Sequence, residues 1–485
     1  MEPMLAVLAQ AWQIVVGVLT ILLNVIASGH AVLHKRDSRA AVGWVGVIWL
    51  APIAGALAYA LLGINRIRRK ASERRAIQPL LLSGEFDSAA RLSGGVSLRH
   101  QPVHLAALAR LVDRVSGRPL TQGNEITPLV NGDEAYPAMV EAIESAQTSI
   151  VLATYIFDHD AAGHMFAAAL GRAARRGVEV RVLIDAVGSR YSRPPITRTL
   201  ARAGVRAALF GRTRVPWRMP YFNLRNHRKI LVVDGRIGFT GGMNIREGNF
   251  LATPSPSPTR DLHFRIDGPV VAQLTQTFAE DWAFATGEVL HGARWFPDLA
   301  PGGEAVARVV TDGPDGDFEK ARLVYLGALG CAQHSVRIVT PYFLPDAGLI
   351  SALNVAALRG VVVEIVLPER VNLALVQWAA THQLWQMLQR GCRIYTTPGP
   401  FDHTKLMLVD DGWALIGSSN WDPRSLRLNW ELLVDCYDRA LVARLSGIVE
   451  DKLNDARLVT KDEVDARPFP IKLRDGLARL ASPYL

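Results

Sequence analysis

A short pattern that occurs twice constrains this sequence more than any other feature. The copies occupy residues 227–234 and 403–410, and each contains a His, a Lys two residues later and an Asp five residues after the Lys. A Gly-x-x-Asn sequence follows each copy and ends at Asn244 and at Asn420. An isolated His-x-Lys is common, but agreement over so many positions argues against chance. The chain is therefore predicted to contain an internal duplication at the scale of a domain.

The similarity extends beyond the two motifs, in the same order and with about the same spacing. The corresponding runs are 149–157 with 335–343, 176–183 with 359–367, and 204–206 with 391–395. Two similar halves can pack about a pseudo-two-fold axis, which places both motifs at one shared cleft. We therefore expect a single site that contains two His and two Lys side chains.

Each motif is predicted to lie on a buried β-strand. Residues 230–233 and 406–409 are apolar runs rich in β-forming residues, and an Asp and a nearby Gly end each run. Side chains alternate along a strand, so the His and the Lys of one motif point the same way. Each motif then presents an imidazole and an ammonium group to one spot.

The residue types of the two motifs indicate phosphodiester chemistry. Two Lys can neutralise the oxygens of a phosphate. One His can attack phosphorus while the other protonates the leaving oxygen, a division of labour that imidazole allows near neutral pH. No metal or other cofactor is expected, because two ammonium groups take the place of a metal ion. The sequence is symmetric as to which His attacks.

The sequence around the motifs has an alternating α/β rhythm. In the first half, strands are predicted at 149–157, 178–184 and 204–210, and helices at 136–146 and 164–176. Strands that alternate with helices predict a mainly parallel or mixed sheet covered on both faces. We expect four regions: an anchor at 1–70, a connector of short helices at 71–123, a first half at 124–300 and a second half at 301–485.

The N-terminal region carries most of the hydrophobic excess of the chain, whose mean hydropathy is +0.14. Residues 4–33 and 40–62 contain no Asp, Glu, Lys or Arg, and each segment is long enough to cross a bilayer core of about 30 Å. We expect them to form a two-helix transmembrane hairpin; a cleaved signal peptide is the alternative for the first segment. The arginines between positions 66 and 75 favour a cytoplasmic location for everything downstream.

The net charge and the cysteine content exclude few classes of binding partner. The formal net charge of +9 suits either nucleic acid or anionic lipid. Cys331, Cys392 and Cys436 are far apart and lack a CxxC spacing, so neither a zinc site nor a disulfide framework is predicted. Residues 471–480 mix apolar and basic side chains, which suits a helix lying on anionic lipid or a helix packed on its own domain. The Pro- and aromatic-rich residues 215–222 are expected in a loop at the site mouth, which either touches lipid or packs as an ordinary loop.

The paired His-x-Lys-x-x-x-x-Asp motif resembles that of the phospholipase D superfamily. The runs around the motifs, and the N-terminal stretch 44–70 with its trailing arginines, resemble bacterial cardiolipin synthases of that superfamily. The resemblance covers nearly the whole chain. It implies an α/β fold of two similar phospholipase D-like halves, each a mixed β-sheet flanked by helices, after an N-terminal two-helix transmembrane hairpin.

The resemblance also implies roles for individual residues. His227 would be the nucleophile and His403 the general acid and base, while the ammonium groups of Lys229 and Lys405 would hold the non-bridging phosphate oxygens. Asp234 and Asp410 complete the catalytic motifs, and we expect them to fix the turn after each strand rather than to take part in chemistry. The remaining candidates are Asn244, Asn420 and Arg225 for substrate binding, and Asp261 and Glu431 for orienting a catalytic His. For Asp261, a surface salt bridge with Arg260 is the alternative.

The resemblance implies that two phosphatidylglycerol molecules react to give cardiolipin and glycerol through a phosphohistidine. The implied location is the bacterial inner membrane, with several passes and a cytoplasmic catalytic region. A hydrolytic phospholipase D would carry the same residues and use water as the acceptor. A nuclease of the superfamily would suit the positive charge, but the two apolar segments argue against it and against a nucleic-acid partner. A non-catalytic membrane scaffold is disfavoured because both motifs are complete.

Overall fold

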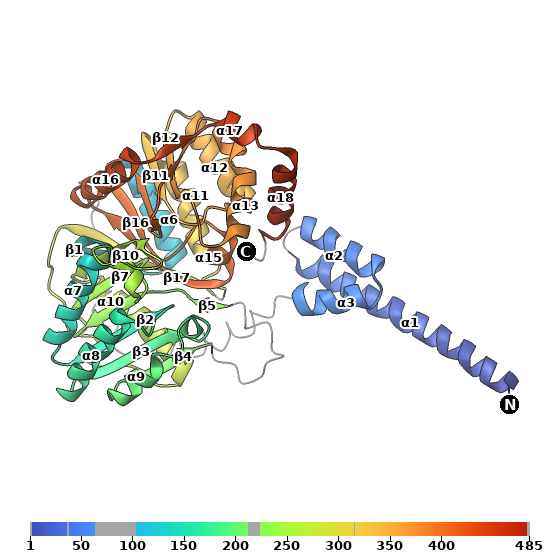
Figure 1. Cartoon of the computed structure of the whole chain (residues 1–485), viewed down its shortest axis with the longest axis horizontal. Helices are drawn as coiled ribbons and strands as arrows, with labels where there is room; N and C mark the ends of the chain where they lie inside the picture. Colours follow the sequence, from blue (N-terminus) through green and yellow to red (C-terminus); the bar gives the residue numbers. More distant parts are fainter. Residues whose placement is uncertain (1, 36–37, 64–102, 212–223, 315, 483–485) are drawn as a thin grey trace. The chain divides into compact units, whose positions relative to one another are not determined.

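The computed structural model describes residues 2–35, 38–63, 103–211, 224–314 and 316–482. The chain divides into two compact units, which are described separately (Figure 1). The first comprises Met1–Lys70 and Thr213–Asn223, and the second comprises Ala71–Arg212 and Leu224–Leu485. The loop predicted at 215–222 lies outside the described residues, as does the part of the connector from 71 to 102.

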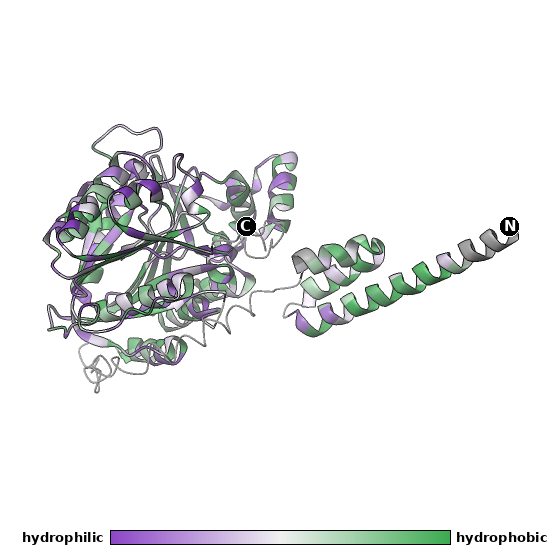
Figure 2. Ribbon diagram, turned by 90° about the horizontal axis from the view of Figure 1, so that it is seen from below, coloured by the Kyte–Doolittle hydropathy of each residue, from purple (hydrophilic) through white to green (hydrophobic). Residues whose placement is uncertain are grey.

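The N-terminal unit consists of apolar helices. Helix α1 runs Glu2–His34, and its portion Ala11–His34 is, within the described residues, the one helix long and apolar enough to cross a membrane (Figure 2). Helix α2 (Ser38–Leu50) packs against it, and the indole N–H of Trp49 donates to the hydroxyl of Ser28 at 3.1 Å. The two apolar segments therefore contact each other.

The second apolar segment differs from its prediction. We expected one continuous span over 40–62, but α2 ends at Leu50 and is followed by α3 (Ala54–Ala58) and a short π-helix (Tyr59–Gly63). Pro52 has no N–H to continue the ladder of helical hydrogen bonds, and Ile53 has a positive φ of 67°. The break at these two residues leaves two short helices, each shorter than a membrane crossing requires.

The second unit contains one large mixed sheet that the two halves build in the same order. From its edge to the centre, the first half contributes β4 (Arg206–Phe210), β3 (Glu179–Asp185), β2 (Ser149–Thr154), β6 (Ile230–Val233), β7 (Ile237–Gly241), β9 (Leu262–Asp267) and β1 (Thr121–Val130). From the centre outward, the second half contributes β10 (Ala305–Asp312), β17 (Asn429–Tyr437), β16 (Trp413–Gly417), β15 (Leu406–Val409), β11 (Ser335–Val339), β12 (Val362–Pro368), β13 (Arg393–Thr397) and β18 (Arg457–Val459). The halves join where β1 pairs antiparallel with β10.

This strand order confirms the duplication. In each half, three parallel strands (β2, β3 and β4, or β11, β12 and β13) continue into an antiparallel group that begins with the motif strand. The predicted motif strands have the expected bounds, and all their residues are buried. Because both faces of the sheet are covered, these strands are apolar throughout rather than alternating.

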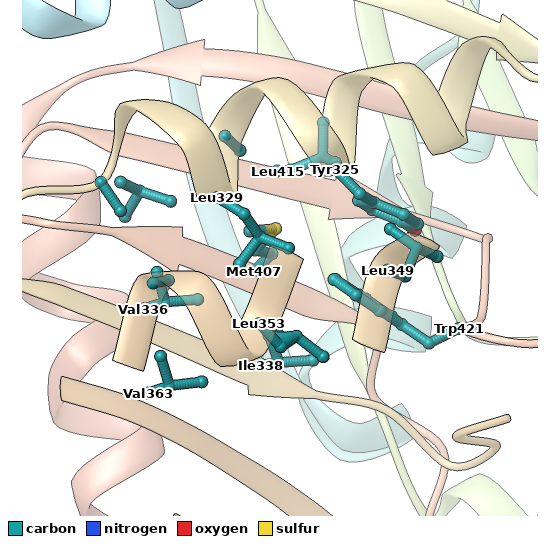
Figure 3. Close-up of a cluster of buried hydrophobic side chains, with 14 of the residues drawn as sticks. Tyr325, Leu329, Val336, Ile338, Leu349, Leu353, Val363, Met407, Leu415 and Trp421 are labelled. Atoms are coloured by element: carbon teal, nitrogen blue, oxygen red, sulfur yellow. The ribbon is translucent and has the colours of Figure 1, made fainter. Parts of the chain in front are cut away.

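Helices cover the sheet and form a separate core in each half. The first half has α7 (Asn131–Ser145), α8 (Ala161–Arg175), α9 (Thr197–Arg202) and α10 (Val271–Thr286). The second half has α11 (Lys320–Cys331), α12 (Ala347–Leu358), α13 (Ala374–Gln383), α14 (Trp385–Leu388), α15 (Pro423–Arg427), α16 (Arg439–Asn454), α17 (Lys461–Asp465) and α18 (Phe469–Leu480). In the second core, the ring of Tyr325 stacks on Trp421 with centroids 4.3 Å apart (Figure 3).

Part of the predicted connector belongs to the second half. Helix α6 (Val103–Ser116) places Leu105, Leu108 and Val112 in the core formed with α11. The guanidinium of Arg308 on β10 donates to the carbonyl oxygen of Ala109 at 2.6 Å and so fixes the helix to the sheet. Strand β1 also begins at Thr121, before the expected boundary at 124. The segment before the first half therefore completes the core of the second.

Candidate active site

Each motif is joined to the opposite half by a short parallel pairing just before its His. Strand β5 (Arg225–Asn226) pairs with the start of β17, and β14 (Phe401–Asp402) pairs with β8 (Thr259–Arg260). Beyond these pairings, the backbone N–H of His227 donates to Trp430 O at 2.9 Å, and that of His403 donates to Arg260 O at 2.7 Å. Each His is thereby fixed next to the residue that follows in the other half.

The residues that follow Trp430 and Arg260 are the carboxylates Glu431 and Asp261. Nδ1 of His227 lies 3.0 Å from a carboxylate oxygen of Glu431, and Nδ1 of His403 lies 2.8 Å from one of Asp261. Both carboxylates are fully buried, while the His side chains are 11% and 13% exposed. A carboxylate on Nδ1 fixes the ring tautomer and leaves Nε2 for chemistry. Each half therefore orients the His of the other half.

The two Lys side chains lie beside the two His. The ammonium group of Lys229 donates to the carbonyl oxygen of His227 at 2.6 Å, and that of Lys405 donates to the carbonyl oxygen of His403. The charge of Lys405 lowers the pKa of His227, and the charge of Lys229 lowers the pKa of His403. The four groups thus act on one another across the halves, and the structure brings them into one buried site.

Burial sets the protonation states of this site. Burial lowers the pKa of Lys229 to about 7 and that of Lys405 to about 8, because the ammonium groups have lost water. Burial and the charge of Lys405 lower the pKa of His403 to about 4, against the opposing charge of Asp261. Although burial disfavours its charge, His227, Lys229 and Ser418 hold the pKa of Glu431 below its usual value. Near neutral pH the substrate-free site therefore contains a neutral His403 and an ionised Glu431.

The motif aspartates lie at the far ends of the motif strands from the His residues. Asp234 has φ 52° and accepts hydrogen bonds from the backbone N–H groups of residues 147–149, at the start of β2. Asp410 has the same φ and accepts from residues 333–335, at the start of β11. Both carboxylates therefore hold a turn and a neighbouring strand together, and the structure does not bring them to the reacting groups.

The substrate-binding candidates are all buried near the motifs. The side-chain carbonyl of Asn244 accepts from Ile156 N at 3.1 Å, which fixes the orientation of its amide. Asn420 donates to Ser425 Oγ at 3.2 Å, and its Oδ1 has no hydrogen-bond partner in the described part of the chain. The guanidinium of Arg225 donates to the carbonyl oxygen of Leu224. The neighbouring Asn226 donates to Asp281 and so supports the loop before His227.

Two tyrosines that sequence reasoning missed line the site. The ring of Tyr155 lies 5.3 Å from that of His227, and the ammonium nitrogen of Lys229 lies 5.7 Å from its centroid. The ring of Tyr342 lies 6.5 Å from that of His403, and its hydroxyl donates to Asn372 at 2.5 Å. A weak signal was present, because each repeated run has a tyrosine near its end, although Tyr155 is the seventh residue of 149–157 and Tyr342 is the eighth of 335–343.

The carboxylate Glu431 has further support that the motifs did not reveal. Ser418 Oγ donates to one of its oxygens at 2.5 Å, and the side-chain amide of Asn429 donates to the other at 3.1 Å. At the place of Ser418, the first half has Gly242. A Cβ at that glycine would lie 2.4 Å from Oδ1 of Asp261. The two carboxylates are therefore held in different ways.

Comparisons with known proteins agree with this architecture. The family described as "Cardiolipin synthase, PLD-like domain" matches residues 139–282 and 325–452, and one described as "Phospholipase_D-nuclease N-terminal" matches 22–63. The chain is 31% identical to a cardiolipin synthase of Geobacillus kaustophilus, over 93% of this chain and 90% of that protein. It is 32% identical to cardiolipin synthase A of Pseudomonas putida, over 96% of each.

A solved structure shares the fold. The crystal structure of phosphatidylserine synthase from Haemophilus influenzae aligns with a TM-score of 0.60 and 16% identity, covering 78% of this chain and all of that one. Two similar halves, each with a His-Lys motif, are the architecture of the phospholipase D superfamily. Within that superfamily, the chain belongs to the cardiolipin synthase family of phosphatidyltransferases.

Proposed function

We propose that this protein transfers a phosphatidyl group from one phosphatidylglycerol molecule to another and releases glycerol. The observation that carries the proposal is the crossed arrangement, in which each buried His has a carboxylate from the opposite half and both Lys lie beside them. This arrangement supplies a nucleophile, an acid and a cationic cradle at one place. The relatives named as cardiolipin synthases support the choice of lipid.

The first step forms a covalent intermediate. Nε2 of His227 attacks phosphorus of the donor lipid, and the bond from phosphorus to the head-group glycerol breaks. His403 gives a proton to the leaving oxygen, so glycerol departs as a neutral alcohol. Free His403 is neutral at pH 7 because its pKa is about 4. The negative phosphodiester bound beside it raises that pKa and favours the imidazolium needed for this step.

The second step reverses the first with a new alcohol. His403 removes a proton from the head-group hydroxyl of a second phosphatidylglycerol, whose oxygen attacks the phosphohistidine. The bond from phosphorus to nitrogen breaks, and His227 regains its neutral form with Glu431 on Nδ1. Two inversions give retention of configuration at phosphorus. The same His serves as acid and then as base.

The polar groups around the motifs hold the phosphate. Lys229 and Lys405 neutralise the non-bridging oxygens, and Asn244 and Asn420 add amide donors. The orphaned Oδ1 of Asn420 supports this role, because a half-turn of the amide pairs that oxygen with the Ser425 hydroxyl. The half-turn also releases the N–H₂ group from Ser425 and leaves it able to donate to a phosphate oxygen. Arg225, the first residue of β5, contributes positive charge just before His227.

The N-terminal unit serves as the membrane anchor in this proposal. Helix α1 crosses the bilayer. Neither α2 nor α3 is long enough to cross alone, so in this proposal the whole charge-free stretch 40–62, bent at Pro52, returns the chain. The protein then lies in the bacterial inner membrane with its catalytic unit on the cytoplasmic side. The arginines that follow residue 65 support this orientation.

The test is a product assay on purified full-length protein with phosphatidylglycerol in mixed micelles. EDTA is present, and products are identified by mass spectrometry. Cardiolipin and glycerol in equal amounts are expected, with no loss of rate in EDTA because two ammonium groups supply the charge. Phosphatidic acid as the sole lipid product would make the protein a hydrolase, and no product from this lipid would overturn the proposal.

A further inference from the structure

The C-terminal helix α18 lies on α13 at one side of the catalytic unit (Figure 1). Ala478 of α18 packs into a small apolar cluster with Leu344 and Ala379. The buried carboxylate of Asp475 accepts hydrogen bonds from Arg467 and Arg474, and the Arg474 guanidinium lies 4.3 Å from the ring centroid of Trp378. One face of the helix is therefore firmly attached to the domain.

The opposite face of α18 is a stripe of large apolar side chains. A helix turns by about 100° per residue, so the four members of this stripe fall within an arc of about 80°. They point away from Asp475 and Ala478. They are, with exposed fractions, Phe469 (75%), Leu473 (51%), Leu477 (59%) and Leu480 (75%). Packing against the domain explains the attached face and leaves this stripe unexplained.

Basic side chains border the apolar stripe on both sides. By the same helical geometry, Lys472 and Arg479 lie along one edge of the stripe. Arg474 lies along the other edge, where its guanidinium also donates to Asp475 and lies over the ring of Trp378. An apolar stripe with cations at its edges is the pattern of a helix that lies in a membrane interface. The cations contact lipid phosphates while the apolar side chains enter the acyl boundary.

We propose that α18 is a second membrane contact, which seats the catalytic unit on a bilayer rich in anionic phospholipid. The occupant is a lipid surface rather than a protein, because Lys472 and Arg479 border one edge of the stripe and the chain as a whole is basic. The inference rests on the proposed function for its choice of an anionic phospholipid. It goes beyond that function because it assigns binding to a helix outside the site.

Apolar side chains are also exposed at the start of α13, the helix on which α18 lies. Leu373 and Leu375, at the start of α13, are 51% and 42% exposed. They follow Asn372, which accepts the hydrogen bond from Tyr342 beside the ring of His403. Docking through α18 and this end of α13 therefore brings Asn372 and Tyr342, which lie next to His403, close to the lipid surface. A substrate lipid can then reach the site without fully leaving the bilayer.

The direct test measures solvent access on the full-length protein in nanodiscs of phosphatidylglycerol and phosphatidylcholine. A spin label is attached at Leu477→Cys in a Cys331→Ser background. The matched control is Ala168→Cys, an exposed position on α8 far from α18 in the catalytic unit (Figure 1). The label at 477 is expected to collide several-fold less often with a water-soluble nickel complex, and more often with oxygen, than the label at 168. Equal accessibility at both positions would overturn the proposal.

A rate measurement tests whether the contact matters for catalysis. The double variant Leu473→Asp with Leu477→Asp is expected to act at least about tenfold more slowly on phosphatidylglycerol in the nanodisc, while its rate on water-soluble dibutyroyl phosphatidylglycerol is unchanged. Leu358→Asp, at an exposed apolar position that ends α12, is the control and should keep both rates. A double variant that keeps the nanodisc rate contradicts the proposal.

A milder variant guards against misfolding and separates this inference from the proposed function. Lys472→Gln with Arg479→Gln keeps the apolar stripe and is expected to weaken the nickel protection at 477 in discs rich in anionic lipid, and to make it less dependent on the anionic fraction than in the unaltered protein. Nickel protection at 477 that is the same with and without anionic lipid would contradict the proposed contact between the cations of α18 and lipid phosphates. Protection at 477 in a protein that forms no cardiolipin would leave the docking helix standing and overturn the proposed reaction.

Discussion

The two catalytic centres share one skeleton but differ in how each holds its carboxylate. Beside His227, Glu431 accepts hydrogen bonds from Ser418 and Asn429 as well as facing the imidazole. Beside His403, Asp261 accepts instead from the backbone N–H of the next residue, Leu262, at 2.8 Å. The longer carboxylate is thus anchored by side chains, and the shorter one is anchored by its own strand.

The residue after the first Gly of each Gly-x-x-Asn sequence explains this difference. Ser418 reaches Glu431, whereas Gly242 leaves room for Asp261, whose Oδ1 a Cβ would approach to 2.4 Å. A serine fits only with the carboxylate of the second half, and a glycine is needed with that of the first. Ser418 with Glu431, and Gly242 with Asp261, therefore form a matched pair of residues in each repeat.

The difference has a consequence for the two imidazoles. At His227, the charge of Glu431 is the largest influence opposing the effect of burial on its pKa. At His403, the charge of Lys405 adds to the effect of burial and lowers the pKa, while the charge of Asp261 opposes both. The first environment suits a nucleophile that becomes positively charged on phosphorylation, and the second suits an acid that gives up its proton readily. On this contrast we propose that His227 is the nucleophile and His403 the acid and base.

Removing each His gives the sharpest test of that contrast. His227→Ala and His403→Ala are each expected to lower turnover by about 10⁴-fold or more. With a p-nitrophenyl ester of phosphatidic acid, whose leaving group needs no acid, His403→Ala should still release one p-nitrophenol per protein and retain a bound phosphatidyl group. Stopped-flow absorbance measures the burst. A burst from His227→Ala instead would reverse the two roles.

Substitution of the two carboxylates should also distinguish the nucleophile from the acid, with a smaller loss of rate than removal of either His. Glu431→Gln and Asp261→Asn are each expected to lower the rate with phosphatidylglycerol by about 10²–10⁴-fold, because an amide favours the wrong tautomer. In the burst phase of the p-nitrophenyl ester, only Glu431→Gln should remain slow, since Asp261 acts through the acid. Equal defects in that phase would mean that the centres are not specialised.

The apolar runs 230–233 and 406–409 were enough to predict the two motif strands with their bounds. The expectation that alternation along these strands aims the His and the Lys was wrong, because 227–229 and 403–405 lie just before β6 and β15 and outside them. The sequence also identified Asp261 and Glu431 as orienting residues, but not which His each one serves. That pairing depends on β5 and β14 joining the opposite halves, and a two-residue strand has no periodicity to detect.

Other misses have similar physical causes. The continuous span expected at 40–62 failed because Pro52 outweighed the apolar composition at that point. Helix α6 was assigned to a connector because its partners on α11 are more than two hundred residues away in sequence, as the contact of Leu105 with that core shows. Composition and local pattern reveal which face of a helix is apolar, but not which distant surface covers that face.

The two lysines provide a test through pH. Tungstate remains a dianion in this range, and its competitive inhibition constant is expected to rise at least about tenfold from pH 7 to pH 9. The sign follows because Lys229, with a pKa of about 7, and Lys405, with one of about 8, lose their charge as pH rises. In a plot of the inhibition constant against pH, Lys229→Arg should remove the rise near pH 7, and Lys405→Arg should remove the rise near pH 8. A constant that does not change with pH would show that both ammonium groups stay protonated.

Ser418→Ala tests the anchoring of Glu431. Loss of the 2.5 Å hydrogen bond is expected to lower turnover about five- to tenfold, the equivalent of about 1–1.4 kcal/mol. The burst with the p-nitrophenyl ester should slow by the same factor, because the defect lies at His227. Gly242→Ser is the reciprocal change and should slow the reaction with phosphatidylglycerol while sparing the burst. Identical profiles for the two variants would break the matched-pair interpretation.

The smallest expected effect concerns the turns behind the two motif strands. Asp234 and Asp410 bind corresponding backbone N–H groups, but Asp410 also accepts from Nε2 of His104 on α6 at 2.7 Å. The His104 side chain is 14% exposed, so we expect His104→Ala to lower the free energy of unfolding by only about 1 kcal/mol. Thermal unfolding of His104→Ala and Asp410→Asn, with Asp234→Asn as the matched control in the first half, measures the effect. A turnover of folded His104→Ala that falls more than about twofold would mean that this contact reaches the reacting groups; an unchanged turnover with a lower melting temperature would confine it to the turn.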